Sequence, residues 1–400
     1  MRLLCCCFLI LFQWSLSAQE MLIGIFTANT IHKIEFSYDT GSYSILGDGK
    51  NFGSILPNEF VSIAKTNEGK LELKHGVRLI GKFKKVELKP NGGNRILRVH
   101  PISPELKTRK YQDGFIITPK KTGVQVVNKV SINHYLMGVV ESEGGGGKHI
   151  EYYKAQAVIS RTYALKHQNK HAKEGFHLCD QVHCQAYHSM MRFTPTIEEA
   201  VNLTTGEFMV DTLTNKLVDG YFHANCGGET SRSDYVWNTN VSYLQPFKDT
   251  FCIHTRQANW EHKIPKVEWR NYLVNQFNYP IEDSNYRNTI YSFDQLSRKA
   301  FYQSPHLGIP LRDIRYHFKL RSTFFSTYPE GDYVILKGRG YGHGIGMCQE
   351  GAMGMANKGL NYHQILSYYF DGIRIENKFR EKYMNQFISE PFYEEEPQWD

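Results

Sequence analysis

Three short segments carry the side chains best suited to chemistry in this chain of 400 residues. The first is residues 141–147, where Glu143 is followed by four consecutive glycines. We expect Glu143 where a strand leaves for a loop, because four glycines cannot hold a stable helix when each costs about 1 kcal/mol relative to alanine. A carboxyl group partly desolvated in such a loop has a raised pKa and can act as a general acid near neutral pH. A solvated loop carboxylate is the alternative.

The second segment combines thiols with imidazoles. It contains His171, His177, Cys179, His183 and Cys184. Two thiols separated by four residues, with imidazoles nearby, could hold a tetrahedral zinc ion through sulfur and nitrogen ligands. In an exported protein the same thiols could instead close a small disulfide loop. The spacing leaves both readings open.

The third segment is a glycine-dense loop at residues 338–349. Glycines occupy every second position from 338 to 346, which lets the backbone turn sharply and approach a ligand. The spacing is not the GxGxxG of a dinucleotide site, and the Lys-Ser/Thr of a phosphate loop does not follow. His343 and Gln349 are therefore candidates for hydrogen bonds to a sugar, with a purely structural turn as the alternative.

The elements that would position these residues indicate an α+β fold. Residues 21–118 alternate short apolar runs with turn residues, which predicts a β-rich region. Residues 151–170 form the clearest helix, because their apolar side chains follow the spacing of one buried face. Residues 132–140 lead from a strand into the glycines. Further strands are expected at 114–118, 123–130, 207–210, 217–223 and 333–337, helices at 196–203 and 360–370, and mixed helix and loop at 255–325.

The amino terminus is typical of a cleaved secretory signal at residues 1–18. Arg2 precedes an apolar run, and small residues precede Gln19. The run is too short to cross a bilayer of roughly 30 Å, although a signal anchor is the alternative. No later stretch approaches ~18 consecutive apolar residues. We therefore expect an exported protein of the periplasm or cell envelope, without a transmembrane segment in the mature chain.

Charge and cysteine content constrain the partners. Loss of Arg2 with the signal would change the formal net charge from +7 to +6, and the basic residues are scattered. A polyanionic wall polymer would suit this balance, with an ordinary solvated surface as the favoured alternative, and we expect no nucleic-acid partner. The cysteines that would survive processing are Cys179, Cys184, Cys226, Cys252 and Cys348. Because an odd number cannot all pair within one chain, some must be metal ligands or free thiols.

Several longer motifs follow one another in a characteristic order. They are YLMGVVESE at 135–143, KAQAV at 154–158, RTYAL at 161–165, CD at 179–180, HCQAY at 183–187, YFHAN at 221–225, GG at 227–228, VW at 236–237 and GYGHGIGM at 340–347. In order and combination they resemble the SpoIID/LytB family, named for a sporulation cell-wall hydrolase and an amidase enhancer. The resemblance covers about residues 110–375.

The resemblance implies a mixed sheet-and-helix SpoIID-type domain at 111–375, after a β-rich N-terminal region at 19–110 and before a tail at 376–400. It implies a peptidoglycan lytic transglycosylase that cleaves glycan strands with Glu143 as its single acid and base, leaving 1,6-anhydro ends. Substrate binding or support of the cleft is assigned to Arg161, Tyr163, Gln185, Tyr187, His343 and Gln349.

The resemblance also bears on the metal. His171, Cys179 and Cys184 look like the zinc ligands of those members that bind the metal, with His177 and His183 as nearby alternatives. The zinc would be structural, because two cysteines and a histidine would brace the loop.

The chain departs from the family pattern in two places. Members usually have Met-Pro and a nearby aromatic residue after the catalytic glutamate, where this chain has glycines at 144–147. This changes the expected shape of the cleft. Cys226 and Cys348 stand where the family often has serine, and they could be free thiols or pair with Cys252.

Three other functions compete. The main alternative is a non-catalytic wall-binding protein that stimulates a cell-wall amidase. A thiol hydrolase could use Cys348 with His343, or Cys184 with His183, although neighbours on a strand would point to opposite faces. A zinc peptidase is the third, but the sequence has no His-Glu-x-x-His.

Overall fold

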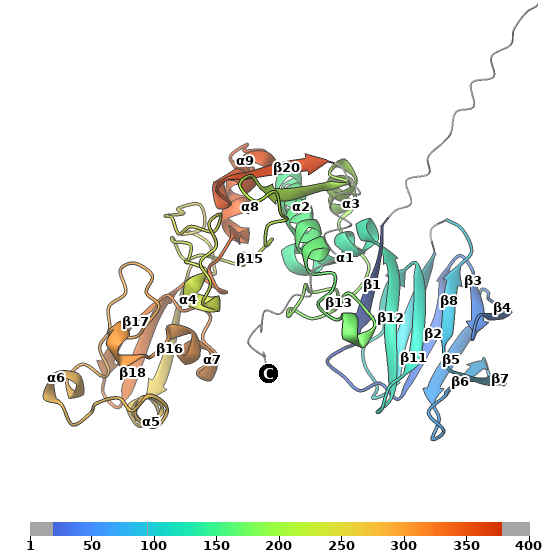
Figure 1. Ribbon diagram of the computed structural model, residues 1–400, viewed down its shortest axis with the longest axis horizontal. Coiled ribbons are helices and arrows are strands. Elements are labelled where there is room, and N and C mark those ends of the chain that lie inside the picture. Colours follow the sequence, from blue (N-terminus) through green and yellow to red (C-terminus); the bar gives the residue numbers. More distant parts are fainter. Residues whose placement is uncertain (1–18, 94, 378–400) are drawn as a thin grey trace, which may run out of the picture.

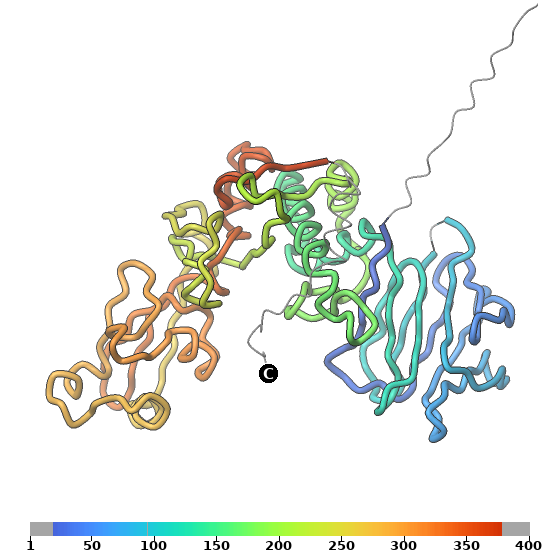
Figure 2. Tube along the Cα trace, in the orientation of Figure 1, coloured from blue at the N-terminus to red at the C-terminus, as the bar shows by residue number. Residues whose placement is uncertain are grey.

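The computed structural model describes residues 19–93 and 95–377, which form a two-sheet region, a helical layer and a smaller inserted unit (Figure 1). The predicted signal at 1–18 and nearly all of the predicted tail at 376–400 lie outside the described residues. Sheets and helices together confirm the predicted α+β class. Figure 2 shows the helical layer between the two-sheet region and the inserted unit.

The two-sheet region consists of strands that pair antiparallel, except for the parallel pairing of β1 with β13. The first sheet runs in the order β13 (Leu178–Cys179), β1 (Glu20–Ile25), β12 (Val124–Ser131), β11 (Gly114–Pro119), β8 (Val86–Pro90), β3 (Tyr43–Gly47), β4 (Lys50–Ile55). The second runs β10 (Arg109–Gln112), β9 (Ile96–Ser103), β2 (Lys33–Thr40), β5 (Phe60–Lys65), β6 (Leu71–His75), β7 (Arg78–Phe83).

The two sheets pack through apolar side chains that alternate along the strands. In β6, Leu71 and Leu73 are fully buried, as a period of two requires. Phe36 of β2 and Phe115 of β11 meet between the sheets with ring centroids 5.1 Å apart. The β-rich prediction for residues 21–118 is therefore confirmed. Residue 110, the proposed domain boundary, lies inside β10, and β11 and β12 continue the first sheet beyond it.

The helical layer is organised around α2 (Ile150–Lys166), which is buried along most of its length and contacts its neighbours on several sides. Those neighbours are α1 (Ile132–Gly144), α3 (Pro195–Leu203), α8 (Gln349–Asn357), α9 (Tyr362–Tyr369) and β14 (Glu207–Asp211). β14 pairs with β20 (Ile373–Asn377), and β15 (Phe222–His223) pairs with β19 (Met347–Cys348). The three predicted helices are confirmed, with α2 and α9 shorter than expected.

Two expectations about local structure differ from what the structure shows. Residues 132–140 belong to α1, which begins after Ser131, whose Oγ accepts the His134 N–H at 3.2 Å. The helix forms because it buries a row of apolar side chains, and the glycines end it rather than prevent it: Gly145 takes φ 64°. The strand expected at 217–223 is reduced to β15. A Cβ at Gly220 would lie 2.5 Å from Ile159 O, so the chain there presses against α2.

Residues 259–339 form the inserted unit, which has its own core. Its elements are β16 (Asn259–Pro265), α5 (Lys266–Phe277), α6 (Ser284–Arg287), α7 (Leu311–His317), β17 (Phe325–Glu330) and β18 (Tyr333–Arg339), and the short helix α4 (Asp234–Trp237) precedes it. The sheet order is β16–β18–β17. We expected mixed helix and loop at 255–325 and missed β16, whose exposed positions are charged or polar.

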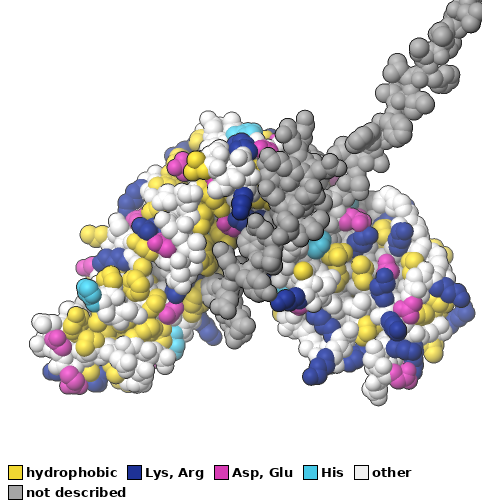
Figure 3. All heavy atoms as spheres, viewed as in Figure 1, with side chains coloured by type: hydrophobic (Ala, Val, Ile, Leu, Met, Phe, Trp, Pro, Cys, Tyr) yellow, Lys and Arg dark blue, Asp and Glu magenta, His cyan; other side chains and the backbone are white. Residues whose placement is uncertain are grey.

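The surface of the described residues mixes charged, polar and apolar side chains (Figure 3). None of the helices between residues 19 and 377 combines the length and apolar character that a membrane span requires. On the face shown in Figure 3, Lys and Arg side chains are dispersed over the two-sheet region rather than gathered in one patch. This dispersal agrees with the scattered basic residues of the sequence.

Trp269 tests the core of the inserted unit. Its ring is fully buried against Phe318, and its Nε1–H donates to Ile290 O at 2.9 Å. We predict that Trp269→Ala lowers the free energy of unfolding of this unit by about 3–5 kcal/mol, because it leaves a cavity. Val267→Ala on the exposed face of α5 is the control and should change it by at most ~0.5 kcal/mol. Urea unfolding followed by circular dichroism measures both; equal effects would contradict a core around Trp269.

Candidate functional site

Glu143 lies half-buried in the last turn of α1. Its Oε1 accepts a hydrogen bond of 2.7 Å from the backbone N–H of Ala186. Burial raises the pKa of Glu143, and the hydrogen bond from Ala186 offsets only part of the rise. The carboxyl group therefore keeps its proton to a higher pH than an exposed glutamate does, as a general acid requires. The expected strand-to-loop setting was wrong, but the partly desolvated carboxyl group is present.

The two residues before Glu143 attach to the same segment as Glu143. Both carboxylate oxygens of Glu141 accept backbone N–H groups from residues 192–193 at 2.9 Å. Ser142 Oγ accepts the N–H of His188 at 3.4 Å. Both carboxylate oxygens of Glu141 are therefore occupied by hydrogen bonds that hold residues 192–193 against α1. By contrast, only one carboxyl oxygen of Glu143 is hydrogen-bonded within the part of the chain that the structure describes.

Gln349, the first residue of α8, brings the glycine-dense loop to Glu143. Its Nε2 lies 3.5 Å from the backbone oxygen of Glu143 and 3.3 Å from Gln156 Oε1. Cys348 caps the N-terminus of α8, because its Sγ accepts the N–H of Gly351 at 3.3 Å. Segments about 200 residues apart in the sequence therefore meet at the candidate acid.

His343 belongs to a cluster of rings. Its ring centroid lies 5.2 Å from that of Trp237, 5.5 Å from His223 and 6.4 Å from Tyr221. Burial lowers the pKa of His343 well below its usual value and that of His223 to about 3. Both imidazoles are therefore neutral at neutral pH. His343, which is partly exposed, can hydrogen-bond an uncharged hydroxyl group, whereas His223 is buried. Sequence spacing gave no sign that Trp237 and His223 join His343, because they come from three separate segments.

Five of the six residues predicted to bind substrate or support the cleft are buried: Arg161, Tyr163, Gln185, Tyr187 and Gln349. Arg161 is fully buried, and its guanidinium donates to Thr204 O at 2.8 Å at the end of α3. Gln185 accepts from Tyr135 at 3.1 Å. Tyr187, also fully buried, donates to Asn128 at 2.9 Å. Tyr163 is 7% exposed. Because these side chains are buried and form hydrogen bonds to the protein itself, they suit support of the cleft better than contact with substrate.

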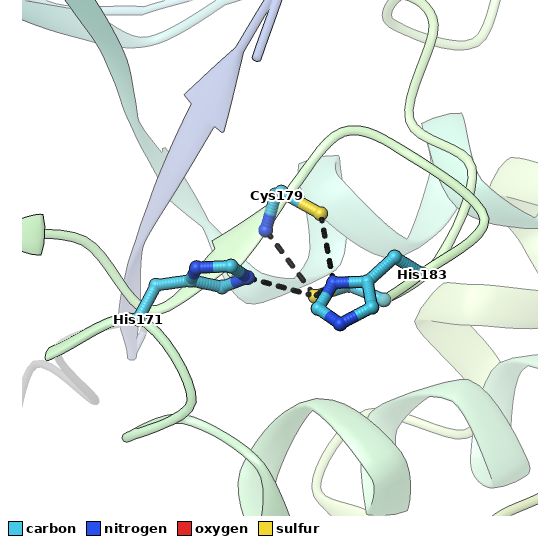
Figure 4. A group of neighbouring side chains, drawn as sticks. His171, Cys179 and His183 are labelled. Atoms are coloured by element: carbon cyan, nitrogen blue, oxygen red, sulfur yellow. Dashed lines mark hydrogen bonds between the residues drawn. The ribbon is translucent and has the colours of Figure 1, made fainter. Parts of the chain in front are cut away.

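The structure brings four potential metal ligands together: His171, Cys179, His183 and Cys184, whose ligand atoms all lie within 4.8 Å of one another. Figure 4 shows the ring of His183 beside the sulfur of Cys179, and the ring of His171 directed toward the second sulfur, that of Cys184. Cys184 Sγ lies 3.5 Å from His171 Nε2 and 3.8 Å from His183 Nδ1, and Cys179 Sγ lies 3.7 Å from His183 Nδ1. The set contains the three predicted ligands and one of the two alternatives.

The other alternative, His177, is directed elsewhere. Its Nδ1 accepts the N–H of Leu22 in β1 at 3.2 Å. Cys179 lies on β13, which adds to the edge of the first sheet beside β1. The carboxylate of Asp180 is fully buried. It accepts a hydrogen bond from the N–H of Phe26 at 2.8 Å and forms an ion pair with Arg109 at 2.7 Å. The cluster is therefore anchored to the sheet.

The structure bears against the thiol hydrolase. Cys348 is fully buried, and its sulfur caps α8, so it is not presented to a substrate. Cys184 and His183 lie in a turn rather than on a strand, and both face the metal cluster. The expectation that they point to opposite faces was wrong, because it assumed a strand.

The fold and the site define an α+β protein in which a glutamate at a helix end meets a glycine-dense loop, beside a Cys-His cluster. Residues 120–210 match the family described as stage II sporulation protein, SpoIID. An uncharacterised protein of Brachyspira hyodysenteriae is 31% identical over 271 residues, which cover 66% of this chain and 72% of that protein.

Two named relatives come from Bacillus subtilis. Stage II sporulation protein D is 26% identical over 286 residues, covering 66% of this chain and 80% of the relative. The amidase enhancer is 25% identical over 291 residues, covering 59% of this chain but only 39% of the enhancer. The chain belongs to the SpoIID/LytB family, as its motifs predicted.

The raised pKa of Glu143 predicts a pH-dependent stability difference. Between the unfolded and folded pKa values the folded chain binds more protons, so this residue's contribution to stability falls as pH rises. Glu143→Gln removes the effect and retains an oxygen for the Ala186 N–H. The variant should therefore be more stable than the wild type at pH 7, and the excess should vanish below about pH 4. Urea unfolding at both pH values measures it; an excess that does not change with pH would contradict a raised pKa.

Proposed function

We propose that this protein is an exported peptidoglycan lytic transglycosylase in which Glu143 is the acid and the base. The observation that carries the proposal is the half-buried carboxyl group of Glu143, with its raised pKa, next to Gln349 at the end of the glycine-dense loop that contains His343. Relatives named for sporulation and for amidase enhancement support a role in the cell wall. Residues 1–18 would direct export.

A single carboxyl group is sufficient for this reaction. Hydrolytic glycosidases usually need two carboxylates, and the nearby Glu141 is occupied by two backbone N–H groups. Glu143 would protonate the glycosidic oxygen as its bond to C1 breaks. The carboxylate would then accept the proton of the sugar's own 6-hydroxyl, whose oxygen bonds to C1. The products are a free glycan end and a 1,6-anhydro end, and Glu143 is protonated again.

We also propose that the His171, Cys179, His183 and Cys184 cluster holds a structural zinc ion. Zinc–sulfur bonds of about 2.3 Å and zinc–nitrogen bonds of about 2.0–2.1 Å give tetrahedron edges of about 3.5 Å between ligand atoms. The observed separations of 3.5 to 3.8 Å fit this geometry. Four protein ligands leave no position for a substrate. Zinc would supply a rigid cross-link, and Ala186, two residues after Cys184, holds the Glu143 carboxyl group.

The relative named amidase enhancer favours one alternative, a protein that binds the wall and stimulates a separate cell-wall amidase without cleaving glycan itself. Both functions need a surface for peptidoglycan. Only the first needs the proton of Glu143.

The direct test uses peptide-free glycan strands and the purified mature protein. We predict that the wild type releases 1,6-anhydro fragments, and that Glu143→Gln lowers the rate by about 10²–10⁴-fold, because the acid is lost. Mass spectrometry of the products measures both. Glu199→Gln, an exposed carboxyl group on α3, is the matched control and should keep the wild-type rate.

Full activity in Glu143→Gln would refute the catalytic assignment. Glycan binding by both proteins, without cleavage by either, would instead support the enhancer. Adding a cell-wall amidase to the same reactions then shows whether its rate increases.

Substitution of His183 and of His177 tests which histidine belongs to the proposed zinc site. We predict that His183→Ala lowers zinc affinity strongly, because it removes one of four ligands, whereas His177→Ala leaves it unchanged. Competition with a coloured zinc chelator measures the affinity. Equal affinities in the two variants would exclude His183 as a ligand.

A further inference from the structure

A second group of potential ligands lies outside the candidate active site. Cys226, Asp249, Cys252 and Cys348 place one sulfur or oxygen atom each within 4.8 Å of the others, and all four residues are buried. They come from the loop after β15, from residues 249–252 and from the end of β19. Neither the proposed reaction nor the first metal cluster uses them.

From this arrangement we infer that the protein binds a second zinc ion, held by Cys226, Asp249, Cys252 and Cys348. Three sulfurs with one carboxylate oxygen are a donor set that suits zinc, since thiolates select soft or borderline metals over magnesium and calcium. Cys226 Sγ lies 3.3 Å from Asp249 Oδ2 and 3.2 Å from Cys252 Sγ. A tetrahedral zinc ion with these ligands has edges of about 3.5–3.8 Å, so small side-chain shifts would admit it.

The surroundings of the four residues are those of metal-bound groups. Asp249 is fully buried, and within residues 19–377 it makes no ion pair with Lys, Arg or His. Its oxygens accept hydrogen bonds from Tyr369, from the N–H of Phe251 and from Cys226. A buried carboxylate with no cation is costly, and a bound cation would remove that cost. Such supporting hydrogen bonds also orient the ligands of metal sites.

Cys348 has similar support, because its sulfur accepts the N–H groups of Cys226 at 3.2 Å and Gly351 at 3.3 Å.

A disulfide between Cys226 and Cys252 is the competing arrangement. It would account for two sulfurs but not for the convergence of Cys348 and Asp249 on the same point. The metal accounts for all four residues.

The site would join the inserted unit to the rest of the protein. The chain enters that unit after Ala258 and leaves it at Gly340, and these residues are hydrogen-bonded, N–H to O, at 2.9 Å. The neighbouring Asn225 pairs with Tyr341. From inside the unit, Arg298 donates to Cys226 O at 2.8 Å. A metal at Cys226 and Cys348 would therefore fix the base of the inserted unit to α8, whose first residue reaches Glu143.

Metal content of the mature protein tests the inference. Because buried ligands bind metal as the chain folds, the protein is produced with zinc present and without chelator. Native mass spectrometry and elemental analysis should find about two zinc ions per chain. Cys252→Ser and Asp249→Asn should each retain about one, and Cys179→Ser should also retain about one by losing the first site instead. Asp332→Asn, an exposed carboxyl group, is the control and should keep both.

Cys252→Ser and Asp249→Asn that both keep the full zinc content of the wild type would overturn the inference, whether the wild type holds one zinc ion or two. Alkylation of the unfolded wild type in chelator, without reductant, needs no variant to fold. The inference expects all five described cysteines to react. If Cys226 and Cys252 are protected until a reductant is added, the two form a disulfide and the metal is excluded. Loss of zinc only in Cys179→Ser would leave the first site intact as a proposal and reject the second.

Discussion

The attachment of residues 186–193 to the last turn of α1 determines the geometry of the candidate site. Glu141, Ser142 and Glu143 all accept backbone N–H groups from that segment. α1 follows β12 directly, and the segment follows β13, so both partners start from strands that flank β1 in one sheet. A rigid sheet, rather than a free loop, therefore positions the candidate acid, as functional groups that need fixed geometry require.

Much of this arrangement could be predicted from the sequence, but its details depended on tertiary contacts. Alternating apolar residues predicted the β-rich half, and helical spacing predicted α2, because both patterns report one buried face. α1 was missed because the glycines after Glu143 were taken to exclude a helix, whereas they end one. The cost of glycine applies inside a helix, and of the four glycines after Glu143 only Gly144, the last residue of α1, belongs to the helix.

In the candidate site, too, some features could be predicted from the sequence and others depended on tertiary contacts. Glu143, Gln349 and the Cys-His group could be singled out by residue type and motif, but motifs do not say which polar side chains face solvent. Arg161 and Tyr187 stand in motifs that resemble a substrate site, yet both are fully buried and hydrogen-bonded to the protein. His183 could be preferred over His177 only once the turn that directs it toward Cys184 was seen.

The position of Glu143 at a helix end also affects its proton. The carbonyl groups at the end of a helix carry partial negative charge, which disfavours an ionised carboxylate there. Burial acts in the same direction, and no Lys, Arg or His forms an ion pair with Glu143 in the described ranges. A cation placed beside it would lower its pKa and remove the acid. The fold instead holds this residue with neutral backbone and amide groups from Ala186 and Gln349, which fix its position with little charge to draw the proton away.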